Sequence, residues 1–277
     1  WAKEVGCSFR LDSMGNLFAR REGVDNTLPV VLMGSHLDTQ PCGGRFDGIL
    51  GVLAALEVLR VMQENNIKTE HPLEIAVWTN EEGARFSPAM MGSGVFSDIF
   101  TKEEMYSHTD ADNLSVQDAL KATEQLGKIP CKAFPIKAYY ELHIEQGPVL
   151  ELANNEIGVV TGGQGVMWNR VRLIGQSAHA GTTPMNSRIN PVLALSSIVQ
   201  SLEKIIEQQE GSLYTLGCIK SAPNSINCVT GEVSFTLDLR HEENKILNQL
   251  QASFETLIET VCSESELEFK VDNFWQA

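Results

Sequence analysis

Pro29-Val30-Val31-Leu32-Met33 is a short apolar run that ends at Gly34 and is followed by the polar stretch Ser35-His36-Leu37-Asp38-Thr39. A run of this length bounded by a glycine predicts a buried strand, with the polar stretch at the strand's carboxyl end. Leu73-Glu74-Ile75-Ala76-Val77-Trp78-Thr79 has the same character and predicts a second strand. Residues 48–63, between the two runs, are apolar nearly all round, which favours a crossover helix inside a layered structure. Together these segments predict an α/β domain with a mainly parallel sheet.

The sheet is expected to gain a third strand at Ala138-Tyr139-Tyr140-Glu141-Leu142-His143-Ile144. Residues 97–127, which precede it, are polar and mixed in composition and predict helices and loops that cover the sheet. The composition changes again at Thr161-Gly162-Gly163-Gln164-Gly165, a flexible, turn-prone joint. We therefore expect two domains, one formed by residues 1–160 and the other by residues 161–277.

Residues 161–277 alternate between strand and helix patterns in the order βαββαβ, which is the order of the ferredoxin-like α+β unit. The clearest strand is residues 232–240, where apolar and polar residues alternate strictly and Arg240 ends the polar face. The other expected elements are strands at residues 166–174, 214–220 and 267–271 and helices at residues 190–209 and 243–264.

The charge balance excludes several classes of partner. The chain has 277 residues, with 36 Asp and Glu against 21 Lys and Arg and a net charge of −15, so nucleic acid and anionic membrane surfaces would repel it. The longest apolar stretch, residues 48–62, is interrupted by Glu57 and Arg60 and is shorter than the ~20 residues that a membrane-spanning helix needs. Six cysteines without a CxxC pair favour reduced thiols and a cytoplasmic location. Because the chain starts at Trp1 and stops without a tail, we expect a fragment cut at both ends.

Polar side chains follow all three predicted strands of the first domain. His36 and Asp38 follow the first strand, Glu81-Glu82 follows the second, and His143 closes the third. The carboxyl ends of parallel strands meet at one edge of a sheet, so these groups are expected to converge there. Imidazole and carboxylate ligands without a nearby thiolate suit Zn²⁺ or a similar divalent metal.

Each of these residues alone has an ordinary structural explanation. A histidine after a strand is often only hydrogen-bonded, and Asp47 before a helix fits an N-cap. An acidic pair is usually solvated, but Glu81-Glu82 stands between a buried strand and Gly83. Adjacent residues in an extended chain point in opposite directions, so one carboxylate can bind a metal while the other faces a water. This division of roles predicts metal-assisted hydrolysis, in which a glutamate takes the proton of the water.

The chain also carries Gly175-Gln176-Ser177-Ala178-His179-Ala180-Gly181-Thr182-Thr183-Pro184. Together with His36-Leu37-Asp38, Asp47-Gly48, Asn80-Glu81-Glu82-Gly83 and His143-Ile144-Glu145-Gln146-Gly147-Pro148, this motif resembles the N-carbamoyl-L-amino-acid hydrolase and β-ureidopropionase group. That group belongs to the di-zinc aminoacylase and carboxypeptidase superfamily, with allantoate amidohydrolase as a close relative. The resemblance runs over nearly the whole chain. It implies hydrolysis of the carbamoyl C–N bond of an N-carbamoyl-L-amino acid or N-carbamoyl-β-alanine to the amino acid, CO2 and NH3.

The resemblance also implies two divalent metal ions, zinc or else manganese, cobalt or nickel. His36 and His143 would bind one ion, Glu82 would bind the other, and Asp47 would bridge the two. Asp38 would orient His36 without touching the metal.

Further roles follow from the same resemblance. Glu81 would be the general base, and His179 would stabilise the charged oxygen of the tetrahedral intermediate, often from across a dimer. Gln146, Asn227 and Arg240 would bind substrate, with Arg240 holding the carboxylate through its planar guanidinium. Residues 161–277 would form a lid that closes about the joint at residues 161–165 and would also make the homodimer contact.

Other readings stay open. The related enzymes complete the second metal site with a histidine from a C-terminal part of the catalytic domain that lies beyond this chain, so we expect residues 1–160 to be an incomplete catalytic domain and the chain alone to be inactive. Alternatives are an allantoate or other ureide amidohydrolase, a metallopeptidase or aminoacylase, and a non-catalytic homologue. Peptidase relatives tend to carry an acidic ligand where His143 stands. Cys42 is interpreted as structural, and His71, His108 and His241 are given no role.

Overall fold

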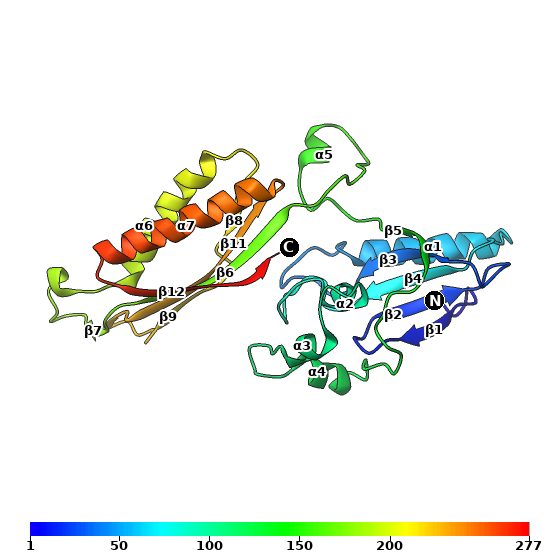
Figure 1. The fold of residues 1–277 in the computed structure, drawn as a ribbon, viewed down its shortest axis with the longest axis horizontal. Coiled ribbons are helices and arrows are strands. Elements are labelled where there is room, and N and C mark those ends of the chain that lie inside the picture. The colour runs from blue at the N-terminus through cyan, green and yellow to red at the C-terminus, as the bar shows by residue number, and fades with distance from the viewer. Residues whose placement is uncertain (277) are drawn as a thin grey trace. The chain divides into compact units, whose positions relative to one another are not determined.

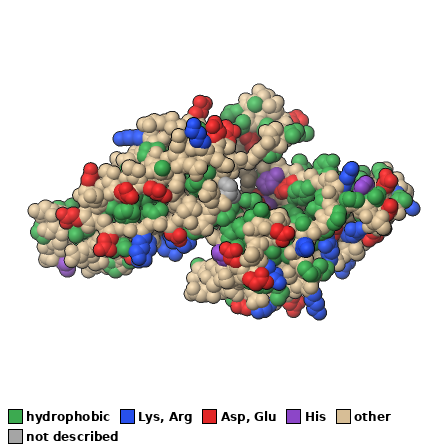
Figure 2. Space-filling view, in the orientation of Figure 1, with side chains coloured by type: hydrophobic (Ala, Val, Ile, Leu, Met, Phe, Trp, Pro, Cys, Tyr) green, Lys and Arg blue, Asp and Glu red, His purple; other side chains and the backbone are tan. Residues whose placement is uncertain are grey.

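The chain divides into two compact units in a computed structural model that describes residues 1–276 (Figure 1). The first unit is Trp1–Gly158 and the second is Val159–Ala277. On the face drawn in Figure 2, acidic and basic side chains are interspersed over both units and form no continuous basic stripe. Within residues 1–276, no helix has both the length and the apolar character of a membrane span.

The first unit contains a five-stranded sheet in the order β1-β2-β4-β3-β5. The strands are β1 (Ser8–Leu11), β2 (Leu17–Arg21), β3 (Val30–His36), β4 (Leu73–Trp78) and β5 (Ile136–Tyr140). The predicted strands correspond to β3, β4 and β5, although β5 ends at Tyr140 rather than at Ile144, and β3 pairs in parallel with both of the others. β1 and β2, for which the sequence pattern gives no prediction, add antiparallel pairings at one edge. The α/β class is therefore confirmed, and the sheet is mixed.

Helices cover both faces of this sheet. Helix α1 (Ile49–Glu64) packs Ala55 and Leu59 against Met33 and Ile75 of the sheet. The alternate residues of the strands face Phe96 of α2 (Met91–Phe96) on the other side. The remaining helices of the unit are α3 (Lys102–Ser107), α4 (Val116–Ala122) and the short α5 (Val149–Leu152).

One glycine is required for the pairing of the two central strands. Gly34 in β3 has a φ of +149°, and a Cβ at this position would lie 1.9 Å from the carbonyl oxygen of Ala76 in β4. Only glycine allows the two backbones to approach this closely. The position immediately precedes the polar end of β3, so the tight pairing fixes where that end lies.

The second unit contains a five-stranded antiparallel sheet with both long helices on one face, and a separate two-stranded sheet formed by β7 and β10 (Figure 1). The strand order of the larger sheet is β12-β6-β11-β8, and β9 also pairs with β11. The expected βαββαβ order is present, but the strand predicted at residues 214–220 is divided into two short strands. The elements are β6 (Gly165–Ile174), β7 (Ala178–His179), η1 (Met185–Ser187), α6 (Pro191–Glu207), β8 (Leu213–Thr215), β9 (Ile219–Ala222), β10 (Cys228–Val229), β11 (Glu232–His241), α7 (Asn244–Glu264) and β12 (Glu268–Gln276).

The core of the second unit lies between its sheet and its two helices. Leu173 of β6 and Leu237 of β11 pack against Ile198 of α6 and Phe254 of α7, and all four side chains are buried. The polar residues that alternate with them, including Arg240, lie on the other face of the sheet. This pattern agrees with the period of two that predicted a half-buried strand at residues 232–240.

Candidate metal centre

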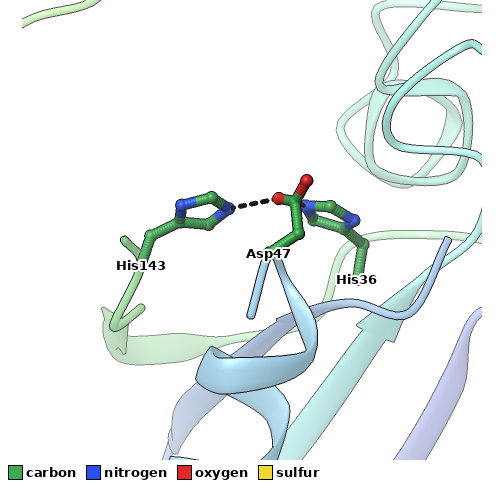
Figure 3. A group of neighbouring side chains, drawn as sticks. All are labelled: His36, Asp47 and His143. Carbon is green, nitrogen blue, oxygen red and sulfur yellow. Dashed lines mark ion pairs between the residues drawn. The ribbon is translucent and has the colours of Figure 1, made fainter. Parts of the chain in front are cut away.

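Two histidines and an aspartate from separate segments of the first unit meet at the carboxyl ends of the parallel strands (Figure 3). His36 is the last residue of β3, Asp47 lies two residues before α1, and His143 follows β5 in a loop. Asp47 Oδ1 is 3.3 Å from His143 Nε2 and 3.7 Å from His36 Nε2. His36 and Asp47 are buried, whereas His143 keeps a partly exposed side chain. The predicted convergence at this edge is therefore present for these three residues.

Hydrogen bonds to backbone carbonyls fix how the two imidazoles present their nitrogens. His36 Nδ1 donates to the carbonyl oxygen of Asp38 at 2.8 Å, and His143 Nδ1 donates to that of Ile144 at 2.7 Å. Because a carbonyl oxygen only accepts, each Nδ1 carries the hydrogen, and in a neutral ring each Nε2 faces Asp47 with a lone pair. Two such nitrogens and a carboxylate oxygen around one point fit a divalent metal ion.

The acidic pair after β4 lies beside this group. Glu81 Oε2 is 3.4 Å from His36 Nε2, and His36, Glu81 and Glu82 each offer a ligand atom within 4.8 Å of the others. Asp38 holds the pair in place, because its carboxylate accepts the backbone N–H of Glu81 at 3.2 Å and that of Glu82 at 3.0 Å. Asp38 thus contacts His36 through its backbone carbonyl and, at 3.7 Å from Nδ1, through its carboxylate, which also holds the acidic pair.

Burial and crowding perturb the charges of the site. Burial raises the pKa of Glu81 and that of Glu82, and neighbouring carboxylates raise both further. Burial lowers the pKa of His36, but the hydrogen bond to Asp38 and the negative charge of Glu81 outweigh it, so this pKa is raised. A cluster of mutually repelling carboxylates in a partly buried site is stabilised by a bound cation.

Two glutamine amides also contact the acidic residues. Gln146 Nε2 donates to Asp47 Oδ2 at 2.8 Å, and Gln40 Nε2 donates to Glu82 Oε2 at 3.0 Å. The family resemblance implies that Gln146 binds substrate, and in the structure its amide contacts Asp47. The sequence gives no signal for Gln40, because this residue stands in a loop without strand or helix periodicity.

Gly48 allows the His36 ring to lie against the start of α1. A Cβ on Gly48 would lie 2.3 Å from His36 Cδ2, 2.4 Å from its Nε2 and 2.5 Å from its Cγ. No real Cβ makes contacts this short. The imidazole of His36 can therefore occupy its position only because Gly48 has no side chain. In the Asp47-Gly48 motif, the aspartate supplies a carboxylate and the glycine leaves room for His36.

In the second unit, two of the predicted residues lie together. His179 of β7 pairs with Cys228 of β10, and the N–H of Ala180 donates to the carbonyl oxygen of Asn227 at 3.1 Å. His179 is exposed, and its Nδ1 accepts the N–H of Gly181 at 3.1 Å. His179 and Asn227 are therefore held at the same end of this unit.

Arg240 lies at the opposite end of the same unit. Glu232, where β11 begins, pairs with Ile174 next to the His179 end, whereas Arg240 pairs with Val166 at the start of β6 (Figure 1). Eight residues of extended chain separate Glu232 from Arg240 (240 − 232), or about 26 Å. Arg240 also donates from Nε and Nη2 to the carboxylate of Asp238 at 2.8–3.2 Å. One copy of this unit does not bring Arg240 and His179 to a common small ligand.

His241 and His71, for which no role is predicted, make hydrogen bonds to the backbone. His241 is buried and donates from Nε2 to the carbonyl oxygen of Glu210, while its Nδ1 accepts the N–H of Glu243. His71 donates to the carbonyl oxygen of Pro29. All six cysteines are free thiols, and the metal-ligand groups found among residues 1–276 contain no cysteine.

Comparison with known proteins gives a consistent result. Residues 32–270 match the model of peptidase family M20/M25/M40. The chain is 44% identical over 263 residues to an N-carbamoyl-L-amino-acid amidohydrolase of Rhizobium meliloti, an alignment that covers 95% of this chain and 63% of that protein. It is 36% identical over 270 residues to an allantoate amidohydrolase of Escherichia coli (strain K12), with 96% and 66% covered. A crystal structure of an amidase of the hydantoinase/carbamoylase family from Burkholderia vietnamiensis has a TM-score of 0.96 at 41% identity, with 100% of this chain and 67% of that chain covered.

Proposed function

The chain belongs to the peptidase M20/M25/M40 family, and from this premise we propose that the protein hydrolyses the carbamoyl C–N bond of N-carbamoyl-L-amino acids. The observation that carries the proposal is the convergence of His36, Asp47 and His143 with a glutamate 3.4 Å from one of the imidazoles. The relative in Rhizobium meliloti is named for this reaction. Since the chain spans 63% of that relative's length, the activity is assigned to the full-length protein.

Enzymes of this family depend on metal, and the ligand chemistry of the site suits that dependence. We assign His36, Asp47 and His143 to one divalent ion, and Asp47 together with Glu82 to a second. Imidazole and carboxylate donors favour zinc and also accept manganese, cobalt or nickel. A bound ion would polarise the scissile carbonyl and lower the pKa of an adjacent water.

Glu81 is proposed as the general base. Its burial raises its pKa toward the range in which a carboxylate can accept a proton from water and later return it. In this role Oε2 takes the proton of the attacking water and delivers it to the departing nitrogen. The backbone N–H of Glu81, held by the Asp38 carboxylate, keeps the side chain beside the metal ligands. The products are the free amino acid, CO2 and NH3.

The second unit is proposed to supply substrate contacts. His179 would donate from Nε2 to the negative charge that develops on the carbonyl oxygen, because its Nδ1 is already accepting the Gly181 N–H. Asn227, beside it, and Gln146 would hydrogen-bond the ureido group. Arg240 would bind the carboxylate of the substrate, which must compete with Asp238 for the guanidinium.

We propose that each active site is completed by a second copy of the chain. His179 and Arg240 lie at opposite ends of one unit, about 26 Å or more apart, and this separation exceeds the length of a carbamoyl amino acid. If both residues contact one substrate, they must come from different copies, as in a homodimer formed through residues 161–277.

Mixing two inactive variants tests this arrangement. Glu81→Gln and His179→Ala homodimers should both be inactive, and unfolding and refolding them together at equal amounts should restore about 25% of wild-type activity, because half of the dimers are mixed and each mixed dimer has one intact site. If the mixture stays inactive although subunit exchange is confirmed, the proposal of a site shared between two copies is contradicted.

The substrate is tested by ammonia release from the full-length, metal-loaded protein. N-Carbamoyl-L-α-amino acids, N-carbamoyl-β-alanine and allantoate are supplied at equal concentration. We expect preference for an N-carbamoyl-L-amino acid. Preference for allantoate would favour the reaction named for the Escherichia coli relative. Inactivity with metal bound would direct the search to peptide or N-acyl substrates, and failure to bind metal would favour a non-catalytic role.

A further inference from the structure

We propose that Arg188 is a positioning residue for His179, acting through the loop that follows β7. The inference rests on the proposed function in one respect, since it takes His179 to be the donor to the charged carbonyl oxygen. Its structural part, the control of the His179 ring by Arg188, stands on contacts within the second unit alone.

The Arg188 side chain reaches back over the loop that precedes it. Nη2 donates to the carbonyl oxygen of Ala180 at 2.7 Å, and Nε donates to that of Thr183 at 3.0 Å. Among residues 1–276, Arg188 makes no ion pair, in contrast to Arg172 and Arg240, which pair with carboxylates on their own sheet. Its half-buried guanidinium is thus directed to two backbone carbonyls, and such charge-assisted hydrogen bonds are stronger than neutral ones.

Both carbonyls belong to the segment that wraps around His179. The N–H of Thr183 donates to the carbonyl oxygen of His179 at 3.2 Å, and the N–H of Gly181 donates to its Nδ1 at 3.1 Å. Arg188 therefore closes a loop whose other end contacts His179 twice, once at its backbone carbonyl and once at its imidazole.

One peptide group connects the guanidinium directly to the imidazole. The carbonyl of Ala180 and the N–H of Gly181 are parts of the same planar, trans peptide, so they point in opposite directions and turn together. Arg188 holds the oxygen of this peptide, and the N–H on the other side points at His179 Nδ1. Fixing the oxygen therefore fixes the direction of the hydrogen that His179 accepts.

This connection determines which nitrogen of His179 can donate. With Nδ1 accepting the Gly181 N–H, a neutral ring carries its hydrogen on Nε2, the outward nitrogen. If the peptide turned over, a carbonyl oxygen would face Nδ1 and favour the other tautomer. Arg188 thus keeps His179 in the form that donates to an oxyanion, without contacting the substrate itself.

The test compares Arg188→Met and Arg188→Lys with the control Arg172→Met in the full-length protein. Arg172 is also on the second unit, but it is exposed and pairs with Glu232 rather than with the loop. We expect Arg188→Met to lower kcat about 100-fold with a much smaller change in KM, because a misplacement of about 1 Å costs this much. Arg188→Lys, which can restore one of the two contacts, should recover part of the loss. Arg172→Met should leave kcat and KM unchanged.

The tautomer of His179 is read separately by ¹⁵N NMR of histidine-labelled protein. Wild type and Arg172→Met should show the Nε2–H form, and Arg188→Met should show a mixture, with Arg188→Lys between them. If the His179 signals stay as in wild type in both Arg188 variants, the proposal is overturned, whatever happens to kcat. If the signals change while kcat does not, the positioning is supported and the catalytic role proposed for His179 is refuted.

Discussion

Replacing Gly48 by alanine should displace the His36 ring and weaken metal binding. The added Cβ would lie 2.3 Å from His36 Cδ2, whereas ordinary contacts begin at 3.4 Å, so the ring or the start of α1 must move by about 1 Å (3.4 − 2.3). The backbone at Gly48 has φ −50° and ψ −24°, which alanine adopts without strain. The steric contact with His36 is therefore the main change that the substitution introduces.

The size of the effect follows from the tolerance of metal coordination. Zinc–nitrogen distances stay within about 0.2 Å of their preferred value, so a 1 Å displacement removes His36 from proper ligation. We expect metal affinity to fall at least about 10–100-fold, or about 1.4–2.8 kcal/mol. Competitive titration with a chromogenic chelator measures the affinity, and far-UV circular dichroism checks the fold.

Gly44→Ala is the matched control. It lies in the same loop, and its Cβ would have nothing within 4 Å, so its affinity should equal that of wild type. Wild-type affinity in a folded Gly48→Ala protein would refute the assignment of His36 as a ligand in this position. An equal loss of metal affinity in Gly44→Ala would show that this loop tolerates no added side chain. The loss in Gly48→Ala could then not be attributed to the contact with His36.

Three further predictions concern Glu81, Asn16 and Asp110 of the first unit. Glu81→Gln should lower kcat by about 10²–10⁴ with bound metal unchanged, measured by ammonia release and elemental analysis, and near-normal turnover would exclude Glu81 as the base. Asn16→Ala should destabilise the protein by about 1–3 kcal/mol in urea unfolding, because the buried Asn16 side chain accepts the N–H of Thr79; an unaltered midpoint would contradict this. The N–H of Leu114 and the Arg85 guanidinium hold the pKa of Asp110 below its ordinary value of 3.8. The ionised carboxylate therefore stabilises the fold at a pH above 3.8. This stabilisation is lost as the pH falls through the lowered pKa of the folded protein. Asp110→Asn should therefore lower Tm at neutral pH but not in strong acid, and an equal drop at both would rule out this carboxylate as the cause.

Sequence reasoning succeeded where residue type and position on a strand were enough. The polar ends of β3 and β4 are visible as breaks in apolar runs, so the meeting of His36 with Glu81 could be expected before the structure was known. The alternation in residues 232–240 likewise identified β11 and placed Arg240 on its open face. These are local patterns, and the sheet converts them directly into spatial neighbours.

The features that the sequence does not predict depend on contacts between segments that no local pattern records. β1 and β2 carry arginines that pair with Glu74 across the sheet, so their apolar pattern is weak. The contacts of Gln40 and Arg188 join a side chain to a segment whose direction no periodicity records. The separation of His179 from Arg240 follows from the register in which β11 pairs with β6, which residue types alone do not specify.

The two units have separate cores, and all the residues assigned to metal belong to the first. A ligand that binds only the folded form stabilises that form by mass action, so metal supply would govern the melting of the first unit and leave that of the second unaffected. In a cell short of metal, the second unit would then stay folded while the first unit loosened. If the homodimer proposed above forms through the second unit, it would keep its dimer contact without metal, and returning metal would restore the first unit by refolding it.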